Sequence, residues 1–461
     1  MQDRSELIPW VVAWVITSAY VIRNQWSRSL PSVGLPFAYI LSLSMIHFFG
    51  GLIYSFPWYS PKNAYLLQNG GTFTTTSLGF VQSTYGIIAF GIGSTIVAES
   101  IVSFSPQNYL KDRPQHPDWQ LPKISLYAGI LFVVAINPVL SQFPGFAAFA
   151  TSGVSLFVVG LCLSCWQAWC NRDLITFWKY VGITCLLPVF TVITMGFISY
   201  GAAAASAVLV FIFSFYRPRW RVLIAAFLAL ALGLSVYVTY IRDRNDLRAQ
   251  SWGGGSLDTK VEQFVKTFKQ FEIIDFFNQN HLEAIDVRLN QNDLVGKSVD
   301  YLENRKAREY ANGETLWTAL IAPIPRILWP GKPEFGGSGG IVPLYTGQNF
   351  AVGTSVGVGQ VMEFYLNFGT PGVVVGFLIF GTILRIIDVI AGHKLLCGNL
   401  LGFITWFLPG INMLQPINAL SEIIASVSAS VVLMISIDRF YGSKTRQVQV
   451  SRLKPKVKKI L

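Results

Sequence analysis

The stretch Gly372-Val-Val-Val-Gly-Phe-Leu-Ile-Phe-Gly-Thr-Ile-Leu384 decides the fold class, because it is apolar throughout and carries no charge. A strand of a membrane β-barrel alternates apolar and polar residues. A helix needs about 20 mostly apolar residues in a row to cross ~30 Å of hydrocarbon. Similar runs recur along the chain, which is 52% hydrophobic and 13% charged, whereas soluble domains carry about 25% charged residues. The sequence predicts an all-α, polytopic integral membrane protein.

Periodic recurrence of these runs gives about eleven predicted spans. They lie approximately at 7–22, 33–56, 78–103, 124–142, 146–169, 177–199, 202–216, 222–241, 370–391, 396–414 and 420–437. They divide the chain into an N-terminal bundle of about eight spans (1–241), a large external loop (242–369), about three C-terminal spans (370–438) and a basic tail (439–461).

Basic residues in the short loops orient the chain. With eleven spans, all the basic loops fall on one side together with the tail, and the opposite short loops hold almost nothing basic beyond Lys62. Lys and Arg collect on the cytoplasmic side of membrane proteins. We therefore expect the N-terminus outside, the tail in the cytoplasm and the insert 242–369 facing outward.

The insert is rich in arginine but not basic overall. It carries 13 Lys and Arg against 15 Asp and Glu, so the formal net charge of +11 comes from the rest of the chain. Anionic lipid headgroups beside the inner face are a sufficient partner for that charge, and no nucleic acid is expected. Seven arginines lie in the insert: Arg242, Arg244, Arg248, Arg288, Arg305, Arg308 and Arg326.

Local patterns predict short helices within the insert. Apolar residues at helical spacing between 261 and 274 favour an amphipathic helix on the membrane surface. Thr315 to Ala322 favours a second helix, ended by Pro323 because proline lacks a backbone N–H. Four prolines surround Arg326, so the backbone there is stiff and the position of Arg326 is fixed. A rigid interfacial turn with a snorkelling arginine is the alternative interpretation.

Metal chemistry has no pattern to support it. The five cysteines lie in or beside predicted spans, and Cys162-x-x-Cys165 lacks the second ligand pair that a structural zinc site needs. We expect no metal and no cofactor.

The stretch 285–375 resembles the O-antigen polymerase family of bacterial oligosaccharide repeat-unit polymerases. The resemblance lies in Arg288-Leu-Asn, Gly313-Glu-Thr, Ile324-Pro-Arg326-Ile-Leu-Trp-Pro-Gly-Lys332-Pro and Glu363-Phe-Tyr-Leu-Asn-Phe-Gly369-x-x-Gly372. Outside this stretch it is architectural. Members of that family commonly carry two large external loops, whereas this chain has one.

The resemblance implies a glycosyltransferase of the bacterial cytoplasmic membrane. Such an enzyme would transfer a growing polymer from undecaprenyl diphosphate onto the next lipid-linked repeat unit, building O-antigen or exopolysaccharide at the outer face. Its partners would be undecaprenyl-diphosphate-linked oligosaccharides and membrane lipids, with flippase and chain-length regulator proteins beside it.

A diphosphate leaving group needs cations, and arginine forks suit phosphate oxygens. We predict that Arg288 and Arg326 bind the diphosphate, supported by Arg242, Arg244 and Lys332. For Arg242, Arg244 and Arg248, an Asp-paired collar at headgroup level is equally open.

The acceptor hydroxyl needs a base or a hydrogen-bond acceptor, and the candidates are Glu363 and His281. Two other functions stay open. A flippase or exporter of lipid-linked saccharides would line its spans with polar residues, of which few are present. The sequence would distinguish an O-antigen ligase from a polymerase only through the stretch 285–375 that carries the resemblance.

Overall fold

The computed structural model describes residues 4–27, 30–62, 72–106, 110, 114–140, 146–216, 220–252, 256–325, 328–333, 337–348 and 356–457. Every regular element within those ranges is helical. Nine of the described helices are long and apolar enough to cross a membrane, and two shorter apolar helices, Leu230–Arg242 and Leu400–Asn412, accompany them. The chain is therefore an all-α protein of multi-pass membrane type, and the count of eleven spans stays a prediction.

The first half of the chain supplies most of the long helices. The uninterrupted ones are α1 (Ile8–Ser27), α2 (Leu35–Ser55), α9 (Ala147–Cys170), α10 (Leu174–Met195), α11 (Ile198–Phe215) and α12 (Trp220–Arg242). Two others contain a short π-helical segment. In the first, α4 (Phe73–Ile92) continues through η2 (Gly93–Val97) into α5 (Ala98–Phe104), and in the second, α7 (Leu121–Leu131) continues through η3 (Phe132–Ile136) into α8 (Asn137–Leu140).

Short helices then occupy the predicted insert, and three long ones end the chain. The short elements are α13 (Arg244–Trp252), α14 (Leu257–Lys269), α15 (Gln279–Leu289), α16 (Asn292–Val299), η5 (Asp300–Asn304), α17 (Glu314–Ile321) and α18 (Gly337–Thr346). The long ones are α19 (Gln360–Leu396), α20 (Leu400–Asn412) and α21 (Leu420–Val457).

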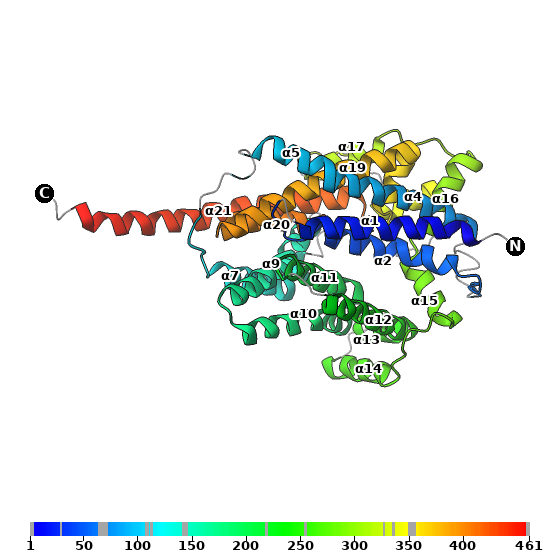
Figure 1. The fold of residues 1–461 in the computed structure, drawn as a ribbon, viewed down its shortest axis with the longest axis horizontal. Helices are drawn as coiled ribbons and strands as arrows, with labels where there is room; N and C mark the ends of the chain where they lie inside the picture. The colour runs from blue at the N-terminus through cyan, green and yellow to red at the C-terminus, as the bar shows by residue number, and fades with distance from the viewer. Residues whose placement is uncertain are drawn as a thin grey trace.

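Two groups of helices make up the bundle (Figure 1). In one, α1, α2, α4 and α19 pack side by side. In the other, α9 packs against α7, α10 and α11 and joins the first group through α20 and α21. The short helices α15 and α16 lie at the end of the bundle where the N-terminus lies, which we call the insert end. The last part of α21 extends beyond the opposite end, which we call the tail end.

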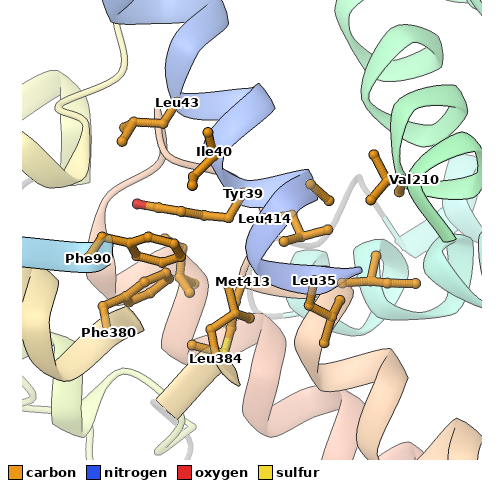
Figure 2. Close-up of a cluster of buried hydrophobic side chains, with 14 of the residues drawn as sticks. Leu35, Tyr39, Ile40, Leu43, Phe90, Val210, Phe380, Leu384, Met413 and Leu414 are labelled. Carbon is orange, nitrogen blue, oxygen red and sulfur yellow. The ribbon is translucent and has the colours of Figure 1, made fainter. Parts of the chain in front are cut away.

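Aromatic and aliphatic side chains fill the centre of the bundle (Figure 2). The ring of Tyr39, on α2, lies between those of Phe90 and Phe380, with ring centroids 4.7 and 4.9 Å away. Its hydroxyl donates a hydrogen bond to Gln360 at the start of α19. This packing ties α2, α4 and α19 into one rigid unit.

Helix α16 lies directly against α4, with backbone touching backbone. A Cβ atom added to Gly79 would lie 1.9 Å from the carbonyl oxygen of Asn292, and one added to Gly296 would lie 1.7 Å from that of Thr75. Only glycine allows such an approach. The insert is therefore not solely an external loop, because part of it packs into the helix bundle.

Helix α19 begins at Gln360, ten residues before the span predicted at 370–391. The chain leaves helical geometry within it at Phe368 and Gly369, and Gly369 has φ 63° and ψ −151°, a region almost restricted to glycine. Pro371 follows and lacks a donor. Hydropathy marks the apolar part after this break and misses the polar first turns.

A group of ion-paired side chains links α19 to α5 and to the start of α2 at the tail end. Arg385 donates to Asp388 at 2.6 Å and to Glu99 at 3.2 Å, and its side chain is 2% exposed. The other oxygen of Asp388 accepts the backbone N–H groups of Val33 and Leu35, each at 3.0 Å. Charges within a bilayer are costly unless paired, and here each has a partner.

Candidate functional site

Three arginines converge at the insert end, where α12 leaves the bundle. Partial burial lowers the pKa of Arg244, and the neighbouring positive charges of Arg288 and Arg248 lower it further. The fold thus brings Arg244, on α13, close enough to Arg288, on α15, for their charges to interact. We call Arg244, Arg248 and Arg288 the arginine cluster.

Members of the arginine cluster differ in their partners. The guanidinium of Arg248 lies 4.3 Å from the centroid of the Phe197 ring and donates to the carbonyl of Gly196 at 3.3 Å. The hydroxyl of Tyr240, near Arg244, donates to the carbonyl of Gly196 at 2.7 Å. Neither Arg244 nor Arg288 forms an ion pair with a carboxylate in the part of the chain that the structure describes. Like charges held together without counter-charges favour binding of an anion.

Arg242, predicted to support diphosphate binding, faces a different group of partners. It pairs with Asp243 at 2.9 Å and with Glu272, and it donates to the carbonyls of Gln270 at 2.8 Å and Thr267 at 3.2 Å. Hydrogen bonds from His281 first, and then from Arg242, lower the pKa of Glu272. Arg242 therefore holds the end of α14 against α12, in the manner of the Asp-paired collar.

His281 belongs to the same group of contacts. Its Nε2 lies 2.8 Å from Glu272, and its Nδ1 accepts the backbone N–H of Asp275 at 3.1 Å. Because Nδ1 accepts, Nε2 carries the proton and donates to Glu272. The side chain is 5% exposed, so both ring nitrogens are occupied by protein groups.

A buried carboxylate anchors α15 and thereby places Arg288. Asp286 accepts hydrogen bonds from Tyr54 at 2.8 Å, from Tyr59 at 2.6 Å and from Asn290 at 2.7 Å. Burial, the largest effect, raises its pKa to about 6. Residues two apart on a helix point in nearly opposite directions, about 200° around the axis. Asp286 faces α2, so Arg288 faces away from it.

Asparagine side chains anchor the next helix, α16. Asn292 accepts hydrogen bonds from Ser83 and from His47, both at 2.8 Å, and donates to the backbone of His47 at 2.7 Å. Beside it, Thr75 donates to Asp293 at 2.7 Å. The Asn residues after Arg288 in the matched stretch are therefore buried contacts that fix α15 and α16 to α2 and α4.

Glu363 lies at the junction of α17, α19 and α21. Its carboxylate accepts the backbone N–H of Leu420 at 2.6 Å, and the residue is 1% exposed. Asn367 donates to Thr315 at 2.6 Å and accepts the N–H of Gly313 at 2.9 Å. Two motifs that are far apart in sequence, Gly313-Glu-Thr and Glu363 to Asn367, thus contact each other directly.

The proline-rich turn is described only in part. Lys332 folds back over it and donates to the carbonyls of Ala322 at 2.8 Å and Ile324 at 3.1 Å. Arg326 lies outside the described residues. Helix α17 ends at Ile321, just before Pro323, which confirms the predicted helix and its terminator.

Sequence reasoning missed one carboxylate, Glu303, at the end of η5. One of its oxygens, Oε1, accepts the hydroxyl of Tyr310 at 3.0 Å and that of Tyr365. The side chain is exposed. Tyr365, two residues after Glu363 in the matched stretch, was the available signal, but its partner lies 62 residues earlier.

Residues 38–446 match the model of the family described as "Domain of unknown function (DUF8712)". The chain belongs to this family. No curated protein and no solved structure matches it. The match begins in α2 and ends in α21, so the DUF8712 domain includes the arginine cluster, Glu303 and Glu363.

Metal ligation has no candidate within the described part of the DUF8712 domain. No group of three or more His, Cys, Asp or Glu side chains that could hold a metal ion occurs among the described residues. The groups that the chain offers to an anionic ligand at the insert end are the guanidinium groups of the arginine cluster.

Proposed function

We propose that this protein is a polysaccharide polymerase. It joins undecaprenyl-diphosphate-linked oligosaccharide repeat units at the outer face of the bacterial cytoplasmic membrane. The observation that carries the proposal is the arginine cluster, in which Arg244 and Arg288 have no carboxylate partner among the described residues. The resemblance of residues 285–375 to the O-antigen polymerase family supports it.

A lipid-linked diphosphate matches the cluster in charge, shape and depth. Each guanidinium offers planar pairs of donors that fit two phosphate oxygens at once. The cluster lies where α12 ends at Arg242, which is the depth of lipid headgroups for a helix that crosses the bilayer. A diphosphate tethered to a polyprenyl chain is held at the same depth.

Charge asymmetry supports the outward orientation. Arg385 lies at the tail end, and the basic residues of the tail follow α21 beyond it. By the positive-inside rule this end faces the cytoplasm, so the insert end faces outward. Polymer is assembled outside the cytoplasm in this kind of pathway, where the lipid-linked units have already been transferred across the membrane.

The test is polymer formation by the purified protein in lipid nanodiscs, supplied with lipid-linked repeat units extracted from a host strain that lacks it. We expect wild-type protein to produce a ladder of polymer lengths. Arg288→Ala should slow it by about 10- to 100-fold at low substrate, because a hydrogen bond to a charged group contributes about 1.5–3 kcal/mol. Arg288→Lys should retain part of the rate.

Arg305→Ala is the matched control. Arg305 is an exposed arginine of the same insert and is paired with Asp300 at 2.7 Å, so its removal should leave polymer formation unchanged. If Arg244→Ala and Arg288→Ala both polymerise as fast as Arg305→Ala, the cluster does not bind the substrate. If wild-type protein moves the lipid-linked unit across vesicles without extending it, the protein is a flippase.

A further inference from the structure

Glu303 combines a fixed orientation with a free oxygen. Tyr310 and Tyr365 both donate to Oε1, and their rings lie 6.3 Å apart between centroids. Tyr365 is fully buried on α19, so its hydroxyl is a fixed donor that holds the carboxylate of Glu303 against the bundle. The other oxygen, Oε2, accepts no hydrogen bond from any residue that the structure describes, and the side chain is exposed.

The other acidic and basic candidates lack this combination. The carboxylate of Glu363 is buried and accepts the backbone N–H of Leu420. His281 is buried with both nitrogens bonded. Asp286 is buried beneath three donors. A general base must reach the proton that it removes, and of these four groups Glu303 is the exposed one.

The loop that follows Glu303 is held rigidly against the bundle. The N–H of Ala307 donates to Tyr301 at 3.0 Å, and that of Ala311 donates to Leu366 at 2.9 Å. Lys306 and Asn312 adopt left-handed backbone geometry, with φ 48° and 46°. Left-handed geometry is uncommon for residues other than glycine and concentrates at functional sites. The position of this loop is therefore determined by its surroundings.

A cation lies on the same loop. The guanidinium of Arg308 lies 4.8 Å from the centroid of the Tyr345 ring on α18, and Arg308 forms no ion pair with a carboxylate among the described residues. Stacking on an aromatic face fixes the plane of a guanidinium while leaving its donors available. The loop thus carries a base and a cation.

We propose that Glu303 is the general base of the transfer and that Arg308 binds the departing diphosphate; this assignment rests on the proposed polymerase function. The acceptor hydroxyl gives its proton to Oε2 of Glu303, and its oxygen forms a bond to the anomeric carbon of the donor. The bond from that carbon to the diphosphate oxygen breaks, and undecaprenyl diphosphate leaves with the electron pair. The proton passes from Glu303 to water.

The arginine cluster then has a separate task. Each transfer involves two lipid diphosphates, one that leaves and one at the far end of the acceptor repeat unit. Helix α16 lies in the chain between Arg288, on α15, and Glu303, in η5, so the two groups belong to separate elements. An oligosaccharide that carries its diphosphate at one end and its reacting hydroxyl at the other would need two such separate positions. We assign the cluster to the acceptor's diphosphate.

The experiment is steady-state polymerisation in nanodiscs with Glu303→Gln, Tyr310→Phe and Arg288→Ala. The amide oxygen of Glu303→Gln can still accept hydrogen bonds from Tyr310 and Tyr365, so the orientation of the side chain is kept while the base is lost. We expect kcat to fall at least about 100-fold with KM within about threefold. Arg288→Ala should instead raise KM for the repeat unit. Glu309→Gln, an exposed carboxylate of the same loop, is the control and should match wild type.

Tyr310→Phe removes one of the two donors that orient the carboxylate of Glu303, and it should lower kcat with KM within about threefold. Glu303→Asp keeps a carboxylate but not the full side-chain length, whereas Glu303→Gln keeps the length but not the base. A base role predicts that Glu303→Asp retains more of kcat than Glu303→Gln, and a purely structural role predicts the reverse. If wild type polymerises while Glu303→Gln keeps more than a tenth of kcat, the assignment is overturned and the polymerase function stands. If wild type makes no polymer, both are overturned.

Discussion

Replacing Gly296 by alanine tests the close contact between α4 and α16. The new Cβ atom would lie 1.7 Å from the carbonyl oxygen of Thr75, and real Cβ atoms do not approach closer than 3.0 Å. The neighbour is backbone within a helix, so it cannot rotate away. Helix α16 must therefore move from α4 by at least about 1.3 Å, the difference between the two distances.

A displacement of that size breaks buried hydrogen bonds. The bond from Thr75 to Asp293, 2.7 Å long, and that from Ser83 to Asn292, 2.8 Å long, would both exceed bonding distance. A buried polar group that loses its partner costs about 1–3 kcal/mol, and overpacking adds about 1–3 kcal/mol. With two such bonds lost, we expect a total loss of about 3–9 kcal/mol, a large part of the stability of a typical protein.

The assay is thermal unfolding of purified protein in detergent, followed by intrinsic tryptophan fluorescence. The melting temperature should fall by roughly 5 °C or more. Gly182→Ala is the matched control, because it lies inside α10 with nothing within 4 Å of its added Cβ, and there alanine should be neutral or stabilising by up to about 1 kcal/mol. If Gly296→Ala melts with wild type, α4 and α16 are not in contact at this point.

Two further changes test the buried charges. Burial raises the pKa of Asp286 from 3.8 to about 6, so the folded state binds the proton more tightly than the unfolded state and stability falls as pH rises from about 4 to 6, by about 3 kcal/mol. Asp286→Asn should flatten that slope in unfolding measured across this range, and an unchanged slope would contradict the reasoning. Arg385→Ala leaves Asp388 buried and Glu99 partly buried without their cation and should destabilise by about 3–5 kcal/mol. Arg305→Ala at the surface should cost less than about 1 kcal/mol; equal melting temperatures for the two variants would contradict this.

Hydropathy predicts the helical membrane architecture because the spans meet lipid or apolar neighbours along most of their length. It places the start of α19 ten residues late because Gln360, Glu363 and Asn367 are polar yet buried. Glu363 has its partner Leu420 57 residues away in sequence, and Asn367 has its partner Gly313 54 residues away. A local pattern carries no information about such partners.

The candidate site shows the same limit in another form. The sequence singles out Arg244 and Arg288 as cations but not their proximity, which depends on how α12 and α15 pack. It also treats Asn290 and Asn292 as loop residues, although their partners lie on α2 and α4 more than 200 positions earlier. Glu303 is overlooked because its orientation comes from Tyr365, which lies 62 residues later in the chain.

The attachment of α2 to Asp388 has a consequence for the order in which the chain is made. Helix α2 begins at Gly34 without a capping side chain of its own, and the N–H groups of Val33 and Leu35 are bound by a carboxylate 355 and 353 residues later. Until Asp388 has been synthesised, the N–H groups of Val33 and Leu35 lack the acceptor that binds them in the final structure. The first helices therefore cannot reach their final arrangement as they emerge from the ribosome. Assembly is completed only when the C-terminal helices arrive, so a chain cut before α19 should remain loosely assembled and a co-expressed C-terminal fragment should complete it.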